Sequence, residues 1–319
     1  MAIIAGIDEA GYGPLLGPMA ITVVAFDLPE DKADCSLWEL LKDAISHDNK
    51  GKKRRLVVCD SKKLYNARNG LKPLEAGVLS FLWSKDLKVT SLSQLLNSLL
   101  CSNNEAIAQY PWYAGKDHPL PSATNVSTIL NYADLLRYVL DKQGVRFHYA
   151  SSCMVAVREF NEQVKKAGNK SIVLFNNCAT LISRLWDVCR GNFRLIVDKQ
   201  GGRNTYTRLL KERFPGTDIK VLKEGAQVSS YEVTDAYRKM EISFVEKGED
   251  TCMAVALASM FSKYIRELFM RLENQYWIQL IPDLKPTAGY YTDAQRFLSQ
   301  IAHVKKKESV QDDMLIRIK

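Results

Sequence analysis

Residues 6–18 read GIDEAGYGPLLGP, two adjacent acids followed by closely spaced glycines and prolines. The apolar run at 3–7 predicts a buried strand, so that Asp8 and Glu9 come at its end. The glycines and prolines behind them predict a sharp return of the chain. Carboxylates beside a backbone with few side chains suit a site that holds divalent metal against a phosphodiester. The alternative is an acidic turn exposed to solvent, which the glycine spacing disfavours.

Apolar runs and helical periodicities alternate along the rest of the chain, which is typical of an α/β fold. Branched apolar residues bounded by turn formers predict strands at 3–7, 21–26 and 56–59, as the first three of one sheet, and at 193–197, 218–222 and 241–245. Apolar residues at helical spacing predict helices at 71–83, 154–164, 179–188 and 251–276.

Residues 85–149 interrupt this pattern. They contain a short amphipathic run at 92–100, loops rich in proline and aromatic residues, and one expected helix at 128–140. We therefore predict that residues 1–84 and 150–319 form one domain and that 85–149 is an insertion into it, of unknown role.

The composition is that of an ordinary soluble protein. A chain of 319 residues with 46% hydrophobic residues can bury one large core. Its seven cysteines, an odd number without a CxxC pair, favour a reduced, cytoplasmic protein over a disulfide framework or a zinc site. No apolar segment approaches the length of a membrane span and the N-terminus carries no charged leader, so we expect neither export nor a membrane partner.

The formal net charge of +8 favours a polyanionic partner such as nucleic acid. A dense cluster of lysines and arginines at 50–55 fits either a solvated loop or a phosphate contact. Its position one strand before Lys62 and Lys63 favours the contact. The lysines at 305–307 fit an exposed helix face or a frayed end.

Residues 6–18 closely resemble the opening signature of the type 2 ribonucleases H, enzymes that cut RNA paired with DNA. The family's central Asp-Ser-Lys is matched, in the same order, by Asp60, Ser61 and Lys62. The resemblance implies a ribonuclease H-like mixed sheet flanked by helices, with 85–149 as a large internal insertion, because family members are usually shorter here. Looser similarities follow at 197–198, 247–250, 258–263 and 289–292.

The resemblance also implies that Asp8, Glu9 and Asp198 are metal ligands. Two-metal phosphoryl chemistry needs several carboxylates on rigid elements, holding two cations about 4 Å apart so that one activates water and the other stabilises the leaving oxygen. Successive side chains of a strand point to opposite faces, so Asp8 and Glu9 can share a site only if the chain turns at residues 10–11. Asp198 by itself also fits a strand-end cap or an ion-pair partner of the nearby basic residues. The expected cofactor is Mg²⁺ or Mn²⁺.

Two adjacent residues compete for the place of a fourth acid. Counting back from Ser259 without a gap puts the family's last acid on Glu249, and a glutamate there resembles the type 3 branch of the family. Asp250 comes just before Thr251 and the expected helix, where an aspartate is a typical N-cap. We predict that Glu249 is the ligand and Asp250 the cap, with Asp250 as the alternative ligand.

Family members usually carry Gly-Arg-Gly where this chain has Gly11, Tyr12 and Gly13. The glycines keep a close approach to a ribose 2′-hydroxyl open. The missing guanidinium weakens the grip on phosphate and speaks against strict specificity for single ribonucleotides. Tyr290 matches a family tyrosine that stacks on the nucleotide beside the cut, and a pair of core tyrosines is the alternative. The other expected substrate contacts are Ser61, Lys62, Arg203 and Lys263.

The resemblance thus implies a divalent-metal-dependent endonuclease that hydrolyses the RNA strand of RNA–DNA hybrids, with Asp8, Glu9, Asp198 and Glu249 as catalytic acids. Two alternatives stay open. One is a non-cleaving relative that binds duplex or structured RNA in the same groove; Tyr12, the insertion and the open choice of the fourth acid favour it. The other is a metal nuclease that acts on a different nucleic acid.

Overall fold

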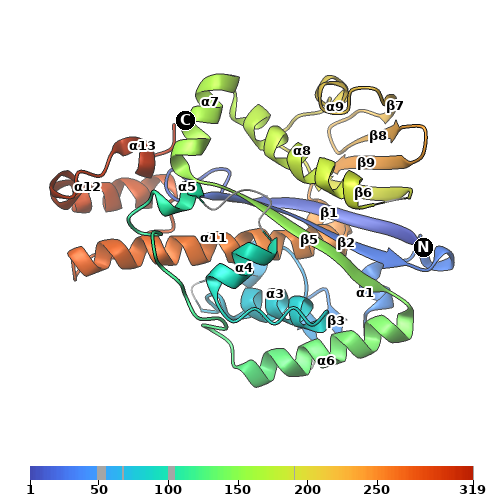
Figure 1. The fold of residues 1–319 in the computed structure, drawn as a ribbon, viewed down its shortest axis with the longest axis horizontal. Coiled ribbons are helices and arrows are strands. Elements are labelled where there is room, and N and C mark those ends of the chain that lie inside the picture. Colours follow the sequence, from blue (N-terminus) through green and yellow to red (C-terminus); the bar gives the residue numbers. More distant parts are fainter. Residues whose placement is uncertain (49–54, 67, 100–104, 190, 319) are drawn as a thin grey trace.

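The computed structural model describes residues 1–48, 55–66, 68–99, 105–189 and 191–318 (Figure 1). Its centre is a seven-stranded sheet with the order β5-β2-β1-β6-β9-β8-β7. The pairs β1–β6 and β6–β9 are parallel and the other four are antiparallel, so the sheet is mixed. The strands are β1 (Ala2–Ala10), β2 (Met19–Leu28), β5 (Arg146–Val155), β6 (Phe193–Asp198), β7 (Asp218–Lys223), β8 (Val228–Thr234) and β9 (Lys239–Val245).

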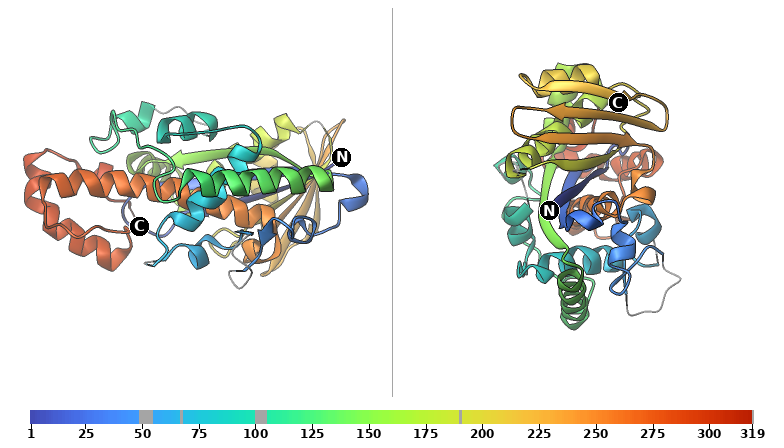
Figure 2. Two further views of the ribbon diagram at one scale, coloured as in Figure 1. Left: turned by 90° about the horizontal axis from the view of Figure 1, so that it is seen from below. Right: turned by 90° about the vertical axis from the view of Figure 1, so that its right-hand side faces the viewer.

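Helices cover both faces of this sheet, which confirms the expected α/β class (Figures 1 and 2). One face carries α11 (Met253–Leu280), with α3 (Lys72–Ser84) and α6 (Val126–Gln143) packed beyond it, and the other face carries α7 (Val157–Ala167) and α8 (Lys170–Val188). The shorter helices are η1 (Glu30–Lys32), α1 (Leu37–Leu40), α2 (Ser61–Leu64), α4 (Leu92–Leu99), α5 (Glu105–Ala108), α9 (Thr207–Arg213), α10 (Gly248–Thr251), α12 (Tyr291–Lys307) and α13 (Asp312–Leu315).

The sheet separates two hydrophobic cores. Every residue of β2 is buried, and its alternate side chains enter opposite cores, Val24 on the side of α11 and Val23 on the side of α8. In β1, Ala5 and Ile7 face the core of α8. The side chain of Asp8 therefore points to the face of the sheet that α11 covers.

Gly6 lets α11 lie directly against β1. A Cβ atom added to Gly6 would come 2.2 Å from the backbone nitrogen of Val255 and 2.3 Å from the carbonyl carbon of Ala254. No side chain fits into this contact. The glycine therefore sets how closely the start of α11 approaches the strand that carries Asp8.

The prediction of a third main-sheet strand at 56–59 is wrong. Only Leu56–Val57 is extended, as β4, and it pairs with β3 (Ile45–Ser46) in a separate two-stranded sheet. The run ends early because the side chain of Asp60 accepts a hydrogen bond from the Lys62 amide and caps α2. The motif 60–62 thus lies on a short helix beside the sheet.

The helix expected at 154–164 begins three residues later, with α7 at Val157. Met154 and Val155 belong instead to β5, which pairs with β2. Their apolar side chains suit a buried strand end as well as a helix. The pattern also missed β8, which pairs with β7 and β9.

Residues 85–149 include α4 and α6 and pass directly into β5, which crosses the expected boundary at 149–150. The buried carboxylate of Glu75 in α3 holds this segment in place. It accepts hydrogen bonds from the amides of Ser122, Ala123 and Thr124 (2.6–2.7 Å) and from the Tyr264 hydroxyl of α11 (2.9 Å). This carboxylate ties the segment to the main sheet's helices. Its status as an insertion stays a prediction.

None of the six cysteines among the described residues forms a disulfide. In the same part of the chain, none of the helices combines the length and the apolar character that crossing a membrane requires.

Candidate metal centre

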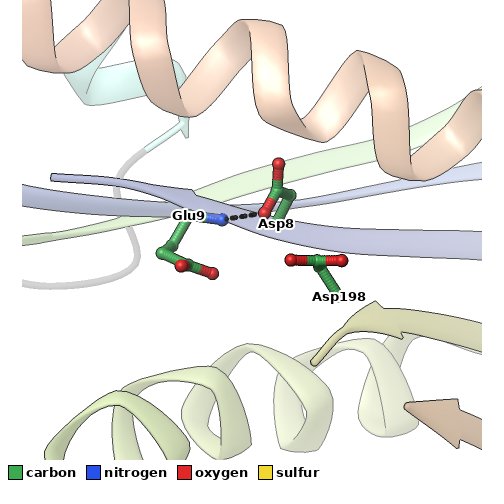
Figure 3. Close-up of side chains that lie close together, drawn as sticks. All are labelled: Asp8, Glu9 and Asp198. Carbon is green, nitrogen blue, oxygen red and sulfur yellow. Dashed lines mark hydrogen bonds between the residues drawn. The ribbon is translucent and has the colours of Figure 1, made fainter. Parts of the chain in front are cut away.

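Three carboxylates converge where β1 and β6 end. Asp8 and Glu9 come from β1, and Asp198 is the last residue of β6. Because the two strands are parallel and Ile7 pairs with Val197, the acids that follow these residues lie side by side. Each of the three offers one oxygen, and these oxygens lie within 4.8 Å of one another (Figure 3).

The expected turn at residues 10–11 is not what brings Asp8 and Glu9 together. Pairing with β2 continues through Ala10, and the left-handed conformation starts at Gly11, so the two side chains leave β1 on opposite faces. Both side chains still lie near Asp198 because β6 ends at that residue. No further residue of β6 lies between the two faces of the sheet at this point. Figure 3 shows the three side chains gathered around this edge.

Hydrogen bonds from β1 itself and from two other elements fix the carboxylates. Asp8 Oδ1 accepts from the backbone amide of Glu9 (2.8 Å), and Ser259 of α11 donates to the same carboxylate. Asp198 Oδ1 accepts from the amide of Gly248 (3.0 Å) at the start of α10. The site is therefore built on rigid elements, as metal ligands require.

Burial and mutual repulsion raise the pKa values of this group. Burial, then Glu9 and Asp198, raise the pKa of Asp8 well above its usual range. Burial and Asp198 raise the pKa of Glu9 to about 7, and burial raises that of Asp198. Holding several anions in a buried site is costly unless a cation compensates them. Hard carboxylate oxygens at this spacing fit Mg²⁺ or Mn²⁺.

Glu249 adjoins the three carboxylates. It is buried in α10, shares a hydrogen bond with Asp198, and its Oε2 atom has no partner among the described residues. Burial and Asp198 raise the pKa of Glu249 to about 6. A buried oxygen without a partner beside three acids can accept a further bond, from a donor or from a cation.

Asp250 points elsewhere. Its carboxylate is 39% exposed and pairs with Lys63 Nζ at 2.5 Å, which lowers the pKa of Asp250. The expectation that it caps the long helix is wrong, because Asp250 lies inside α10 and α11 starts after Cys252 without a side-chain cap. Cys252, whose backbone is extended, separates the two helices.

Two residues of the 60–62 motif lie beside the acids. The Ser61 hydroxyl is 2.9 Å from that of Ser259, which bonds Asp8. Burial lowers the pKa of Lys62, but the negative charges around it have the larger effect, so that its pKa is raised. These charges belong to Asp60, Asp8, Glu249 and Glu9. Lys62 thus contributes positive charge to the site.

The other expected basic contacts are engaged differently. Lys263 Nζ pairs with Glu267 at 2.5 Å and lies over the Tyr65 ring. Arg203 donates to Ser171 Oγ (2.7 Å), and its buried Nε has no partner among the described residues. Most of the cluster at 50–55 falls outside the described residues, and only its last member is described: Arg55 donates to the carbonyl of Lys42.

The segment 11–13 follows the acids directly. Gly11 has a φ of +89°, and a Cβ atom on Gly13 would meet nothing within 4 Å, so the outer side at Gly13 is open. Tyr12 is partly buried. Burial, and to a smaller extent the charge of Glu9, raise the pKa of Tyr12, whereas the charge of Arg203 lowers it. Tyr290 is 55% exposed, so the alternative of a core tyrosine pair is wrong.

Sequence reasoning missed the residues that hold the carboxylates in place, above all Ser259 and Gly248. Ser259 and Ser262 are one helical turn apart on α11, and both bond Asp8, the second at its carbonyl (2.9 Å). Two serines at this spacing within an apolar helix were the available signal. The backbone amide of Gly248 left no signal in the sequence.

A scan against protein-family models and a search of curated proteins returned no match. Among solved structures, the chain is similar to the PCNA:RNase HII complex from Archaeoglobus fulgidus (TM-score 0.46, 16% identity, covering 99% of this chain and 94% of that one). It is also similar to ribonuclease H2 from Pyrococcus horikoshii OT3 (TM-score 0.42, 14% identity, covering 98% of this chain and 92% of that one). A third match is Bst-RNase HIII in complex with Mn²⁺ (TM-score 0.45, 11% identity, covering 99% of this chain and 66% of that one).

Proposed function

We propose that this chain is a divalent-metal-dependent endonuclease of the ribonuclease H type, which hydrolyses the RNA strand of RNA–DNA hybrids in the cytoplasm. The observation that carries the proposal is the convergence of Asp8, Glu9 and Asp198 at the ends of two parallel strands. The motif at residues 6–18, which resembles type 2 ribonucleases H, supports the same activity.

In this proposal Asp8, Glu9, Asp198 and Glu249 hold the cations. Bound Mg²⁺ or Mn²⁺ would activate water and stabilise the leaving oxygen. Ser259 and the Gly248 amide keep two of the carboxylates in place. The unpartnered Glu249 oxygen supports a second ligand position beside Asp198.

The substrate strand would pass over the glycines that follow the acids. The open side of Gly13 lets a ribose approach the backbone, and Lys62 supplies positive charge for a phosphate next to the carboxylates. The exposed ring of Tyr290 offers a surface on which a base or sugar can stack. The net charge of +8 favours binding to a nucleic acid.

The proposal is tested by cleavage of end-labelled substrates in Mg²⁺ and in Mn²⁺. We expect the RNA strand of a hybrid to be cut in metal and left intact in EDTA. Asp8→Asn should abolish cleavage while hybrid affinity stays similar, because removing one anion near phosphates does not weaken electrostatic binding. Asp218→Asn, at the exposed start of β7, is the matched control and should cleave normally.

The substrate panel separates the proposal from its alternatives. A single ribonucleotide in duplex DNA and a duplex RNA are assayed beside the hybrid. Binding of the hybrid without cleavage of any substrate would identify a binding protein. Cleavage of duplex RNA alone would identify a nuclease with a different substrate.

A further inference from the structure

The end of the chain packs beneath the loop of residues 11–17, called here the glycine loop. The amide of Arg317 donates to the carbonyl of Leu15 (2.9 Å), and Ile316 forms an isolated antiparallel bridge with Leu16. On its other side the segment is held by Asn161 of α7, which donates to the Ile316 carbonyl (2.8 Å) and accepts from the Ile318 amide (2.9 Å). Residues 316–318 therefore form a strap between α7 and the glycine loop.

The Arg317 side chain closes this contact. It is 2% exposed, and its Nε and Nη2 atoms donate to the carbonyl of Gly17 at 2.9 and 2.6 Å, while Nη1 donates to the carbonyl of Gly11. The guanidinium lies 4.8 Å from the centre of the Phe160 ring. No carboxylate in the described part of the chain lies at ion-pair distance from it. The carbonyls at the two ends of the glycine loop therefore take up its charge.

A second buried arginine packs against the same loop. Arg266 of α11 donates to the carbonyls of Ala288 (3.0 Å) and Leu16 (3.4 Å), and a Cβ atom on Gly11 would lie 2.5 Å from its Nε. Gly11 and Gly17 have φ values of +89° and +79°. The inner side of the loop is thus filled, whereas its outer side at Gly13 is open.

We propose that Arg317 is a positioning residue for substrate binding. By holding the carbonyls of Gly11 and Gly17 together, it fixes the conformation in which residues 11–13 meet the substrate strand. Only Ala10 separates Glu9 from this loop, so a shift of the loop changes where the strand lies relative to the carboxylates. Arg317 contacts none of the carboxylates, so the metal site itself does not depend on it. The inference rests on the proposed function.

The test replaces Arg317 by methionine, which keeps much of the side chain's volume and removes its donors. Arg317→Lys, which keeps the charge but cannot reach both carbonyls in the same way, is the second variant if the first is unstable. Arg158→Met is the matched control, because Arg158 ties α13, which precedes the strap, to α7 through Asp313 (2.9 Å) and does not touch the glycine loop. Amide hydrogen exchange, hybrid affinity and Mn²⁺ affinity are measured for each.

In Arg317→Met we expect faster exchange of the backbone amides at residues 11–13 and 15–17 of the glycine loop, and a hybrid Kd and KM raised on the order of tenfold, with little change in kcat or in Mn²⁺ affinity. Arg158→Met should leave loop exchange and hybrid affinity unchanged. Unchanged loop exchange in Arg317→Met and Arg317→Lys overturns the strap. Faster exchange with unchanged hybrid affinity overturns the role in substrate binding. If the wild-type protein neither binds nor cuts a hybrid while loop exchange rises in the variant, the proposed function fails and the strap is supported.

Discussion

The hydroxyl oxygens of Ser61 and Ser259 lie 2.9 Å apart and join α2 to α11 next to the Asp8 carboxylate. Ser259 also donates to that carboxylate, so a single serine links the helix of the 60–62 motif to Asp8. The position of Asp8 therefore depends on two helices that lie far apart in the sequence.

Ser259→Ala should weaken metal binding and turnover by about tenfold or more, because it removes a hydrogen bond that orients a ligand. We expect a stability cost of about 1 kcal/mol. The measurements are Mn²⁺ affinity, turnover and urea unfolding. Ser98→Ala, on the exposed side of α4, is the control, because the Ser98 hydroxyl donates only to the Gln94 carbonyl of its own helix. An unchanged Mn²⁺ affinity in Ser259→Ala would show that the serine does not orient Asp8.

Glu249→Gln should reduce turnover strongly with little change in melting temperature, because it keeps the side-chain shape and removes a ligand charge. Asp250→Asn removes only an exposed pair with Lys63 and should cost less than about 1 kcal/mol with turnover kept. Both variants are assayed for turnover and melting temperature. An inactive Asp250→Asn beside an active Glu249→Gln would mean that Asp250 is the ligand.

Gly6→Ala should be strongly destabilising, by about 3 kcal/mol, because its methyl group would meet the backbone of Val255 and Ala254. Gly13→Ala, where the methyl group meets nothing within 4 Å, is the matched control for stability. Urea unfolding compares the two variants with the wild type. Equal midpoints for both would contradict the close contact between β1 and α11.

Stability in EDTA should fall as the pH rises from 5 to 8. The folded-state pKa of Glu9, about 7, lies above its value in the unfolded chain, so the stability present at low pH is lost as the pH rises through this range. Mg²⁺ should restore the stability at pH 8, and Glu9→Gln should flatten the dependence in EDTA. Thermal melts at several pH values measure this. A wild-type melting temperature that rises toward pH 8 in EDTA would oppose the account.

The strands at 3–7, 21–26 and 193–197 could be predicted because they are apolar runs at the centre of the sheet. β5 could not, because its first seven residues (RFHYASS) mix charged and polar side chains with apolar ones, and they take their place only by pairing with β2. β8 did leave a signal, since the apolar Tyr231 and Val233 alternate with the polar Ser230, Glu232 and Thr234.

The candidate acids at positions 8, 9 and 198 could be named from the motif and the strand ends, but their proximity could not. It depends on the parallel pairing of β1 with β6, two strands almost 190 residues apart in sequence. The partner of Asp250 likewise depends on where α2 lies relative to α10. The arginine at 317 sits in a short tail without periodicity, and only the folded chain brings it to Gly11 and Gly17.

Titration of the nucleic-acid-free protein with Mn²⁺ shows directly whether Asp8, Glu9 and Asp198 form a divalent-metal site. Wild-type protein and Asp198→Asn are compared by calorimetry and by the electron paramagnetic resonance signal of free Mn²⁺, with Asp218→Asn as control. We predict that the wild type and the control bind Mn²⁺ and that Asp198→Asn loses at least about tenfold in affinity. Equal Mn²⁺ affinity in the wild type and in Asp198→Asn would contradict the account.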